Sequence, residues 1–209
     1  MPRKTKTRET ILAVATELFG TYGLNGVSTR QIAQAANVNK TLIFYHFQSK
    51  ENLYLSVFKS RIKDFRDRID TLFAETETGL PSIEAFVRAQ IGFLGENRDI
   101  VRILIRELID NESQIDSPPS VILKEAIDTL RPVSTKLFQS INEAREKGDI
   151  RDVDPAQTLV NIISLNIFFF LGQPIMQIVN PAFATTEFQG RRVDHVLDLL
   201  LNGLKERTD

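Results

Sequence analysis

The chain has no cysteine, which excludes disulfides and thiolate metal sites and is compatible with a reducing compartment. Histidine is nearly as scarce, with His46 and His195 as the only two. The sequence also lacks a G-x-S-x-G turn, a phosphate-binding loop, a dinucleotide fingerprint and a paired-histidine metal motif. Because a nucleophile needs a base and an orienting group beside it, we expect no enzyme, no catalytic residue, no metal site and no cofactor.

Strand patterns and targeting patterns are missing as well. Only helical periodicity is strong, which predicts an all-α fold of about nine helices in two unequal domains, residues 1–50 and 51–209. The amino terminus MPRKTKTRET is basic but continues into amphipathic sequence, so we expect a cytoplasmic protein without a signal peptide. The most apolar segment, residues 159–171, is interrupted by Asn161, Ser164 and Asn166. It is short for a membrane span, and no membrane partner is expected.

The charges that are present are unevenly distributed. The whole chain has a formal net charge of −1, yet residues 1–50 hold seven basic and two acidic side chains, a net charge of +5. The remaining residues then hold 19 basic and 25 acidic side chains, a net charge of −6. A basic end on an acidic body favours attraction of a phosphate backbone at that end. For residues 3–8 alone, the alternative is a solvated charged tail.

Two short helices with clear start signals follow in residues 28–47. Ser28 and Gln31 have the spacing of a capping box, and Asn39 has the position of a second N-cap. Asn37 lies where the chain must turn, and asparagine tolerates the left-handed backbone of such a turn. A helix to about Ala36 and another from Lys40 to about His46 form a helix-turn-helix, whose second helix fits a DNA major groove.

The stretch VSTRQIAQAANVNKTLIFYHFQSKENLY, residues 27–54, resembles the DNA-binding signature of the TetR family of transcriptional regulators. Asn37 stands where the family usually has glycine, and Phe44 where an aromatic residue is common. Hydroxyl and ammonium groups suit phosphate oxygens, whereas side chains at the start of the second helix can reach base edges. Ser28 and Asn39 would also be retained as caps without DNA. The predicted DNA contacts are Ser28, Thr29, Asn39, Lys40, Thr41, Tyr45, His46 and Lys50.

The rest of the chain predicts a regulatory domain. A long helix from about Lys50 to Leu72 has an apolar stripe, and later helices are predicted over residues 155–173 and 191–204, with a loop at 181–189. The Phe-rich helix over residues 155–173 either lines a ligand cavity or packs against a second copy. The resemblance implies that the last two long helices form a four-helix bundle with their copies in a homodimer, which would bind a palindromic operator.

We therefore predict a sequence-specific DNA-binding regulator, a repressor that an unidentified small molecule releases. The alternative is a helical interaction module that binds a protein or a membrane surface. The arginines at 98, 102 and 106 share a helix face, and form either an anion-binding wall or ion pairs with neighbouring acids. The predicted ligand-binding residues are Phe65, Phe93, Arg102, Asn166, Phe169 and Gln173.

Overall fold

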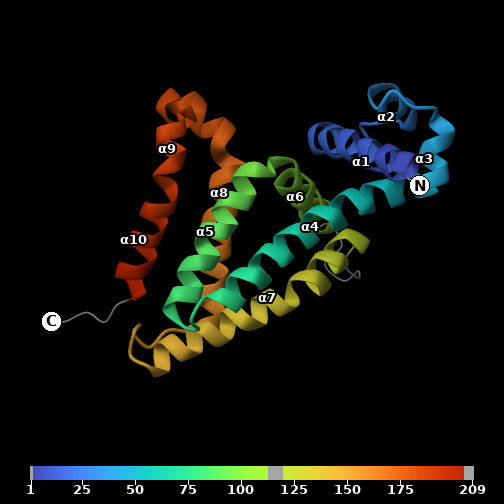
Figure 1. Ribbon diagram of the computed structural model, residues 1–209. Helices are drawn as coiled ribbons and strands as arrows, with labels where there is room; N and C mark the ends of the chain where they lie inside the picture. The colour runs from blue at the N-terminus through green and yellow to red at the C-terminus, as the bar shows by residue number, and fades with distance from the viewer. Residues whose placement is uncertain (1, 113–119, 205–209) are drawn as a thin grey trace. The chain divides into compact units, whose positions relative to one another are not determined.

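The computed structural model describes residues 2–112 and 120–204, and Figure 1 shows its course. Within these residues the secondary structure is helical and contains no strand, which confirms the all-α prediction. Nine helices have seven or more residues, and a five-residue α9 and a 3-10 turn η1 complete the described part. The helices are α1 Pro2–Tyr22, α2 Thr29–Ala35, α3 Lys40–Phe47, α4 Lys50–Glu75, α5 Leu80–Glu96, α6 Arg98–Glu112, α7 Val121–Glu146, α8 Pro155–Val179, η1 Pro181–Ala184, α9 Thr186–Gly190 and α10 Arg192–Leu204.

The chain divides into two compact units, each of which is discontinuous in sequence. Unit 1 comprises Met1–Asp64 and Asn97–Thr129, and unit 2 comprises Phe65–Glu96 and Leu130–Asp209. Helices α4 and α7 each contribute residues to both units. Unit 1 therefore contains more than a helix-turn-helix, and the proposed domain boundary at residue 50 stays a prediction.

In unit 1, α1, α2 and α3 (blue in Figure 1) share a core of fully buried apolar side chains. Ile11, Ile32 and Ile43 have no exposed surface, and the ring of Phe19 meets that of Tyr54 edge-on at 5.1 Å. These side chains come from four different helices. The short α2 and α3 are consequently held by tertiary packing, since helices of seven and eight residues are marginal alone.

Helix α6 packs closely on α1 within unit 1. A Cβ added to Gly20 would lie 2.4 Å from Asp99 Cβ, so only glycine allows this approach. Arg106 then donates from Nη1 to the Phe19 carbonyl oxygen (3.3 Å) and from Nη2 to the Thr21 carbonyl oxygen (3.0 Å). The Thr21 carbonyl lies in the last turn of α1, where intrahelical donors run out, whereas the Phe19 carbonyl oxygen also accepts from the Gly23 N–H (2.8 Å). The Arg106 guanidinium thus bonds to backbone carbonyl oxygens of α1, which neither interpretation of the arginine row included.

In unit 2, α5 packs against both α8 and α10. The α5 face that is buried includes Phe86, Gln90 and Phe93, which are spaced four and three residues apart. Phe65 of α4 completes a ring cluster with Phe86 (centroids 6.3 Å apart) and Phe93 (4.7 Å). The buried face of α5 therefore places the polar Gln90 between two aromatic residues, Phe86 and Phe93.

Two predicted boundaries after residue 150 are wrong. Helix α8 does not end near Gln173 but continues to Val179 with Pro174 inside it. The φ of proline is close to the helical value and its ring removes one backbone hydrogen bond, so the residues on either side can maintain the helix. The predicted loop 181–189 contains η1 and α9. Asn180 starts η1, since its Oδ1 accepts from the Ala182 N–H (3.0 Å) and Pro181 takes the first position.

Helix α8 is also the one helix of the described residues that is long and apolar enough to cross a membrane, judged by length and composition alone. At 25 residues it is not too short, so that reason for excluding a span was wrong. A single helix of this kind is weak evidence, because core helices of soluble proteins pass the same test. Only 22% of its most apolar window is buried, which leaves an apolar face uncovered.

Candidate nucleic-acid interface

The two short helices of unit 1 begin as the sequence predicts. The Gln31 N–H donates to Ser28 Oγ (3.2 Å) and the Ser28 N–H donates to Gln31 Oε1 (2.9 Å), so the capping box is complete. Asn39 Oδ1 accepts from the Thr41 N–H (2.8 Å). Asn37 has a φ of 51°, in the left-handed region that the turn requires. Local side-chain hydrogen bonds therefore fix where α2 and α3 start, and the left-handed Asn37 marks the turn between them.

Helix α3 has one buried and one polar face. Ile43 and Phe47 are buried, whereas Lys40, Thr41 and Tyr45 are exposed, Tyr45 to 60%. The outward face thus carries an ammonium and two hydroxyl groups over a little more than one helical turn. Groups of this kind donate and accept hydrogen bonds at phosphates and base edges.

The other predicted DNA contacts differ in exposure. Ser28 and Asn39 are exposed caps, Thr29 is half-buried in the first turn of α2, and His46 is half-buried with its ring centroid 5.0 Å from that of Tyr45. Lys50 is half-buried too. All eight residues lie in unit 1, on α2, α3 or directly beside them.

Lys50 has a structural task that the sequence did not reveal. Its Nζ donates to the carbonyl oxygens of Leu24 (3.0 Å) and Val27 (3.3 Å). These bonds fasten the segment that precedes α2 to the start of α4. A lysine ammonium has three donors, so one remains for a phosphate oxygen.

The basic amino-terminal residues belong to a helix, and the side chains of Lys6 and Arg8 are solvent-exposed on it. Helix α1 begins at Pro2, and the Arg8 guanidinium lies 5.1 Å from the centroid of the Phe47 ring. This cation–π contact joins α1 to the end of α3. Sequence reasoning missed it because the two residues are far apart in sequence and no local pattern links them.

In unit 2 the structure brings together most of the predicted ligand-binding residues. Asn166, Phe169 and Gln173 lie on one buried face of α8, at spacings of three and four residues. Asn166 Nδ2 donates to Gln90 Oε1 (2.8 Å), and Gln90 stands between Phe86 and Phe93 of the ring cluster that includes Phe65. Arg102, in contrast, is an exposed side chain of α6 in unit 1.

Arg192, at the start of α10, was not predicted for this region. Its Nη2 donates to the Leu165 carbonyl oxygen (3.1 Å), and its guanidinium carbon lies 4.6 Å from the centroid of the Phe169 ring. Burial lowers the pKa of Arg192 from its ordinary value, because an apolar environment disfavours the charged form. The helical stripe of α10 gave no sign of this residue, since arginine at a helix start is ordinarily solvated.

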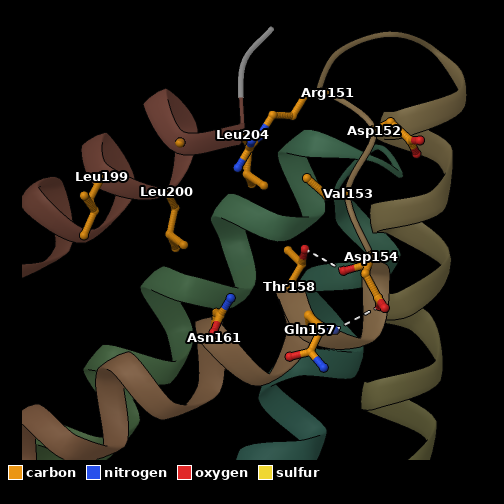
Figure 2. A pocket seen from close by; sticks show the side chains of 11 residues that line it. Arg151, Asp152, Val153, Asp154, Gln157, Thr158, Asn161, Leu199, Leu200 and Leu204 are labelled. Carbon is orange, nitrogen blue, oxygen red and sulfur yellow. Dashed lines mark hydrogen bonds between the residues drawn. The ribbon is translucent and has the colours of Figure 1, made fainter. Parts of the chain in front are cut away.

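A pocket of about 420 Å³ in unit 2 lies elsewhere, between the start of α8 and the end of α10 (Figure 2). On the α8 side its polar groups bond to one another: Asp154 Oδ1 accepts from the Ala156 and Gln157 N–H groups, and Thr158 Oγ1 donates to the Asp154 carbonyl oxygen. Leu199, Leu200 and Leu204 line the α10 side. None of the six predicted ligand-binding residues lines this pocket.

Comparison with known sequences is consistent with the geometry of unit 1. Residues 11–57 match the family described as bacterial regulatory proteins, tetR family. The chain is 24% identical to the HTH-type transcriptional regulator RutR of Escherichia coli (strain K12) over 201 residues, which is 96% of this chain and 91% of RutR. It is 28% identical to the HTH-type transcriptional repressor NicS of Pseudomonas putida over 154 residues, 70% of this chain and 67% of NicS.

Solved structures share the fold at low sequence identity. The ketosteroid transcriptional regulator KstR2 of Mycobacterium tuberculosis is similar with a TM-score of 0.75 at 17% identity, with 96% of this chain and 95% of that chain covered. The fatty acid degradation regulator FadR of Bacillus halodurans is similar with a TM-score of 0.71 at 19% identity, over 96% and 97% of the two chains. At these identities the likeness establishes the fold.

Proposed function

Because the chain belongs to the TetR family of bacterial transcriptional regulators, and is therefore a DNA-binding regulator and not an enzyme, we propose that it is a homodimeric repressor that a small molecule releases from its operator. The observation that carries the DNA-binding part is the outward face of α3. Lys40, Thr41 and Tyr45 are exposed there while Ile43 and Phe47 anchor the helix.

The roles of the proposed DNA contacts follow from their positions. Asn39, Lys40 and Thr41 begin α3, the end of a recognition helix that contacts base edges. Hydroxyl groups and the third donor of Lys50 suit phosphate oxygens, which orient the protein. The proposed contacts remain Ser28, Thr29, Asn39, Lys40, Thr41, Tyr45, His46 and Lys50.

The homodimer is proposed from the uncovered face of α8. Exposed apolar side chains recur on it at spacings of three to eight residues and form a stripe along the helix, and Leu199 of α10 is exposed as well. An apolar stripe of this length marks an interaction surface, and a second copy supplies a matching one. The stripe comprises Val160, Phe168, Leu171, Ile175 and Ile178.

A dimer carries two copies of the helix-turn-helix formed by α2 and α3. It would bind a palindrome whose half-sites are one helical turn apart, or a multiple of it. The effector part is supported by what the relatives are called: NicS is named a repressor, and KstR2 and FadR are named for regulation of ketosteroids and of fatty acid degradation. An effector releases the operator only if it binds one arrangement of the protein more tightly than the other. We place the regulator in the cytoplasm, where its DNA is.

The test is selection of genomic fragments by the purified protein at two salt concentrations, with the variant Lys40→Ala, Tyr45→Ala in parallel. We expect one shared palindrome, lost at high salt and with the variant, because phosphate contacts release counterions. The control is Lys147→Ala, which replaces an exposed lysine of unit 2 and should retain DNA binding. Recovery of no common sequence by a folded dimer would contradict the proposal.

The exposed face of α8 also supports the second candidate, a module that binds a protein or membrane surface through apolar contacts. That function predicts binding that changes little with salt and is unaffected by the Lys40→Ala, Tyr45→Ala variant. It also predicts that the genomic selection recovers no common DNA sequence, so the two functions give opposite results in that experiment.

A further inference from the structure

Four buried side-chain atoms in the described residues have no hydrogen-bond partner, and all four belong to unit 2. They are Asn166 Oδ1, Gln173 Nε2, Gln173 Oε1 and Arg192 Nε. Asn166 is 0% and Gln173 1% exposed, so solvent does not satisfy these amides. Buried polar groups in proteins are nearly always paired, and an unpaired one needs a reason for being there.

The residues that carry these atoms flank one aromatic residue, Phe169. Asn166 and Gln173 lie one turn before and one turn after Phe169 on the same buried face of α8, and Arg192 lies over the Phe169 ring at 4.6 Å. The Arg192 bond to the Leu165 carbonyl oxygen fixes the guanidinium beside that face. Three polar side chains from α8 and α10 therefore gather around an apolar surface.

The free atom of Asn166 is an acceptor. Its Nδ2 donates to Gln90 Oε1 (2.8 Å) and to the Ile162 carbonyl oxygen (3.2 Å). Exchange of the amide oxygen and nitrogen would place that oxygen against the Ile162 carbonyl oxygen, so the hydrogen bonds fix the orientation. Gln173, with both amide atoms unpaired, offers one donor and one acceptor in either orientation.

Arg192 supplies a positive charge that the described residues do not neutralise. The acidic residues nearest in sequence pair with other arginines: Glu187 with Arg191 (3.6 Å) and Asp194 with Arg88 (3.7 Å). Among the described residues, no carboxylate lies within ion-pair distance of Arg192. A guanidinium with an unpaired Nε is a good donor to a carboxylate.

The surroundings of these polar atoms are apolar. Gln90, which holds Asn166, lies between Phe86 and Phe93 on α5, and Phe169 itself meets Phe170 at 5.1 Å. A ligand that pairs with the polar atoms would thus place the rest of its body against phenylalanine rings. Pockets with a few convergent polar groups in an aromatic lining are typical of small-molecule sites.

We propose that Asn166, Gln173 and Arg192 are the recognition groups of the effector site, and that the effector is an amphipathic hydroxy or amido acid. Its carboxylate binds Arg192, its hydroxyl or amide group binds Asn166 and Gln173, and its hydrocarbon or aromatic body packs on Phe169. This inference rests on the proposed effector-controlled function. The pockets of about 420 and 210 Å³ in unit 2 are lined by other residues. The three recognition residues are buried or half-buried, so an effector that reaches them would favour one arrangement of unit 2 over another.

The first test uses the full chain and two probes, 3-hydroxydecanoate and 4-hydroxyphenylacetate, with thermal unfolding as the measurement. At least one acid should raise the Tm, because a ligand that binds only the folded state stabilises it. The corresponding primary amide, which has the same body without the charge, should raise the Tm less. Equal shifts for acid and amide, or no shift with either acid at millimolar concentration, would overturn the proposal.

The second test needs no ligand. Gln173→Met keeps the shape of the side chain and removes both unpaired atoms, so the Tm of the ligand-free protein should rise by about 2 °C or more. The same variant should lose the response to the acids. If Gln173→Met lowers the Tm, the amide is already paired in the folded protein and the proposal is wrong.

Arginine variants separate charge from structure. Arg192→Gln should weaken binding of the responding acid about 10-fold to 100-fold, whereas the matched control Arg191→Gln, an exposed neighbour, should leave it unchanged. Equal effects of both variants would contradict the assignment of Arg192. These measurements do not involve DNA, so absence of operator binding would refute the proposed function while the site could still be confirmed.

Discussion

Helices α3 and α8 place their polar and apolar side chains in opposite ways. Helix α3 buries Ile43 and Phe47 and exposes Lys40, Thr41 and Tyr45. Helix α8 buries Asn166 and Gln173 and exposes a stripe that includes Ile178, which is 85% exposed. Within a single chain, buried amides and an exposed apolar stripe, as on α8, do not stabilise the fold.

The difference indicates which kind of partner each helix meets. A polar exterior on a buried apolar anchor is suited to a charged, hydrated partner such as DNA. An apolar exterior is suited to another protein surface, and unpaired buried amides are suited to a small molecule with polar groups. The substitutions below test these two arrangements and the packing of the units that carry them.

Charges on the outer face of α8 should have the largest effect. The double variant Phe168→Asp, Ile175→Asp places two carboxylates in the stripe, so the dimer dissociation constant should rise by more than about 100-fold. Light scattering after size-exclusion chromatography would show a monomer, and operator binding would be lost with it. Val121→Asp, at an exposed apolar position outside the stripe, is the control and should remain dimeric. A dimeric double variant would refute this interface.

Two lysines of unit 1 should then separate recognition from folding. Lys40→Ala should lower operator affinity about 10-fold and reduce the salt dependence by about one phosphate, with an unchanged Tm. Lys50→Met should lower the Tm as well, because the Leu24 and Val27 carbonyl oxygens lose their donor. Titration of labelled operator by fluorescence anisotropy at several salt concentrations, beside thermal unfolding, gives both quantities. An equal Tm loss in both variants would show that Lys40 is structural.

The close approach of α1 and α6 should be the next most sensitive feature. Gly20→Ala forces a Cβ to within 2.4 Å of Asp99 Cβ, so the helices must separate and the free energy of unfolding should fall by about 1–3 kcal/mol. Gly92→Ala, in a helix with nothing within 4 Å of the added atom, is the matched control and should be neutral or stabilising. Urea unfolding of both variants tests this, and a Gly20→Ala protein as stable as the parent would exclude tight packing here.

The smallest effect is expected in unit 2, at the partly exposed ion pairs of Asp70. Hydrogen bonds from Lys136 (2.9 Å) and from Arg66 hold the pKa of Asp70 below its usual value of 3.8. A lowered carboxyl pKa stabilises the fold above the unfolded pKa, and this stabilisation is lost as the pH falls through the folded pKa. Asp70→Asn should therefore cost at most about 1 kcal/mol at pH 7 and nothing well below pH 3.8. Urea unfolding from pH 7 to pH 2 tests this; a constant difference would contradict it.

The sequence predicted the starts of α2 and α3 and the turn between them, because these depend on residues close together in sequence. Ser28, Gln31 and Asn39 act on backbone groups two or three residues away, so their spacing alone predicts the caps, and Asn37 marks the turn for the same reason. Gln48 also has a positive φ, of 65°, and ends α3 without glycine, which no residue preference indicates.

What the sequence did not predict depends on contacts between distant residues. Lys50 bonds to carbonyls 23 and 26 residues earlier, and Arg106 to carbonyls 85 and 87 residues earlier. Pro174 shows the converse: a local helix-breaking rule is outweighed by the segments on either side. Asn166 and Gln173 were proposed as ligand-binding residues from the sequence, but their unpaired atoms became evident only once burial was known.

The bonds from Arg106 to the end of α1 limit how this regulator can be re-engineered. Residues 97–129 belong to the same compact unit as the recognition helix, although they begin 50 residues after its last residue, Phe47. A chimera that took residues 1–64 from another regulator would place that regulator's residues at positions 20 and 21 against the α6 of this protein. Grafts that transfer a new operator specificity should therefore carry α6 with the head, or retain at least its Asp99 and Arg106.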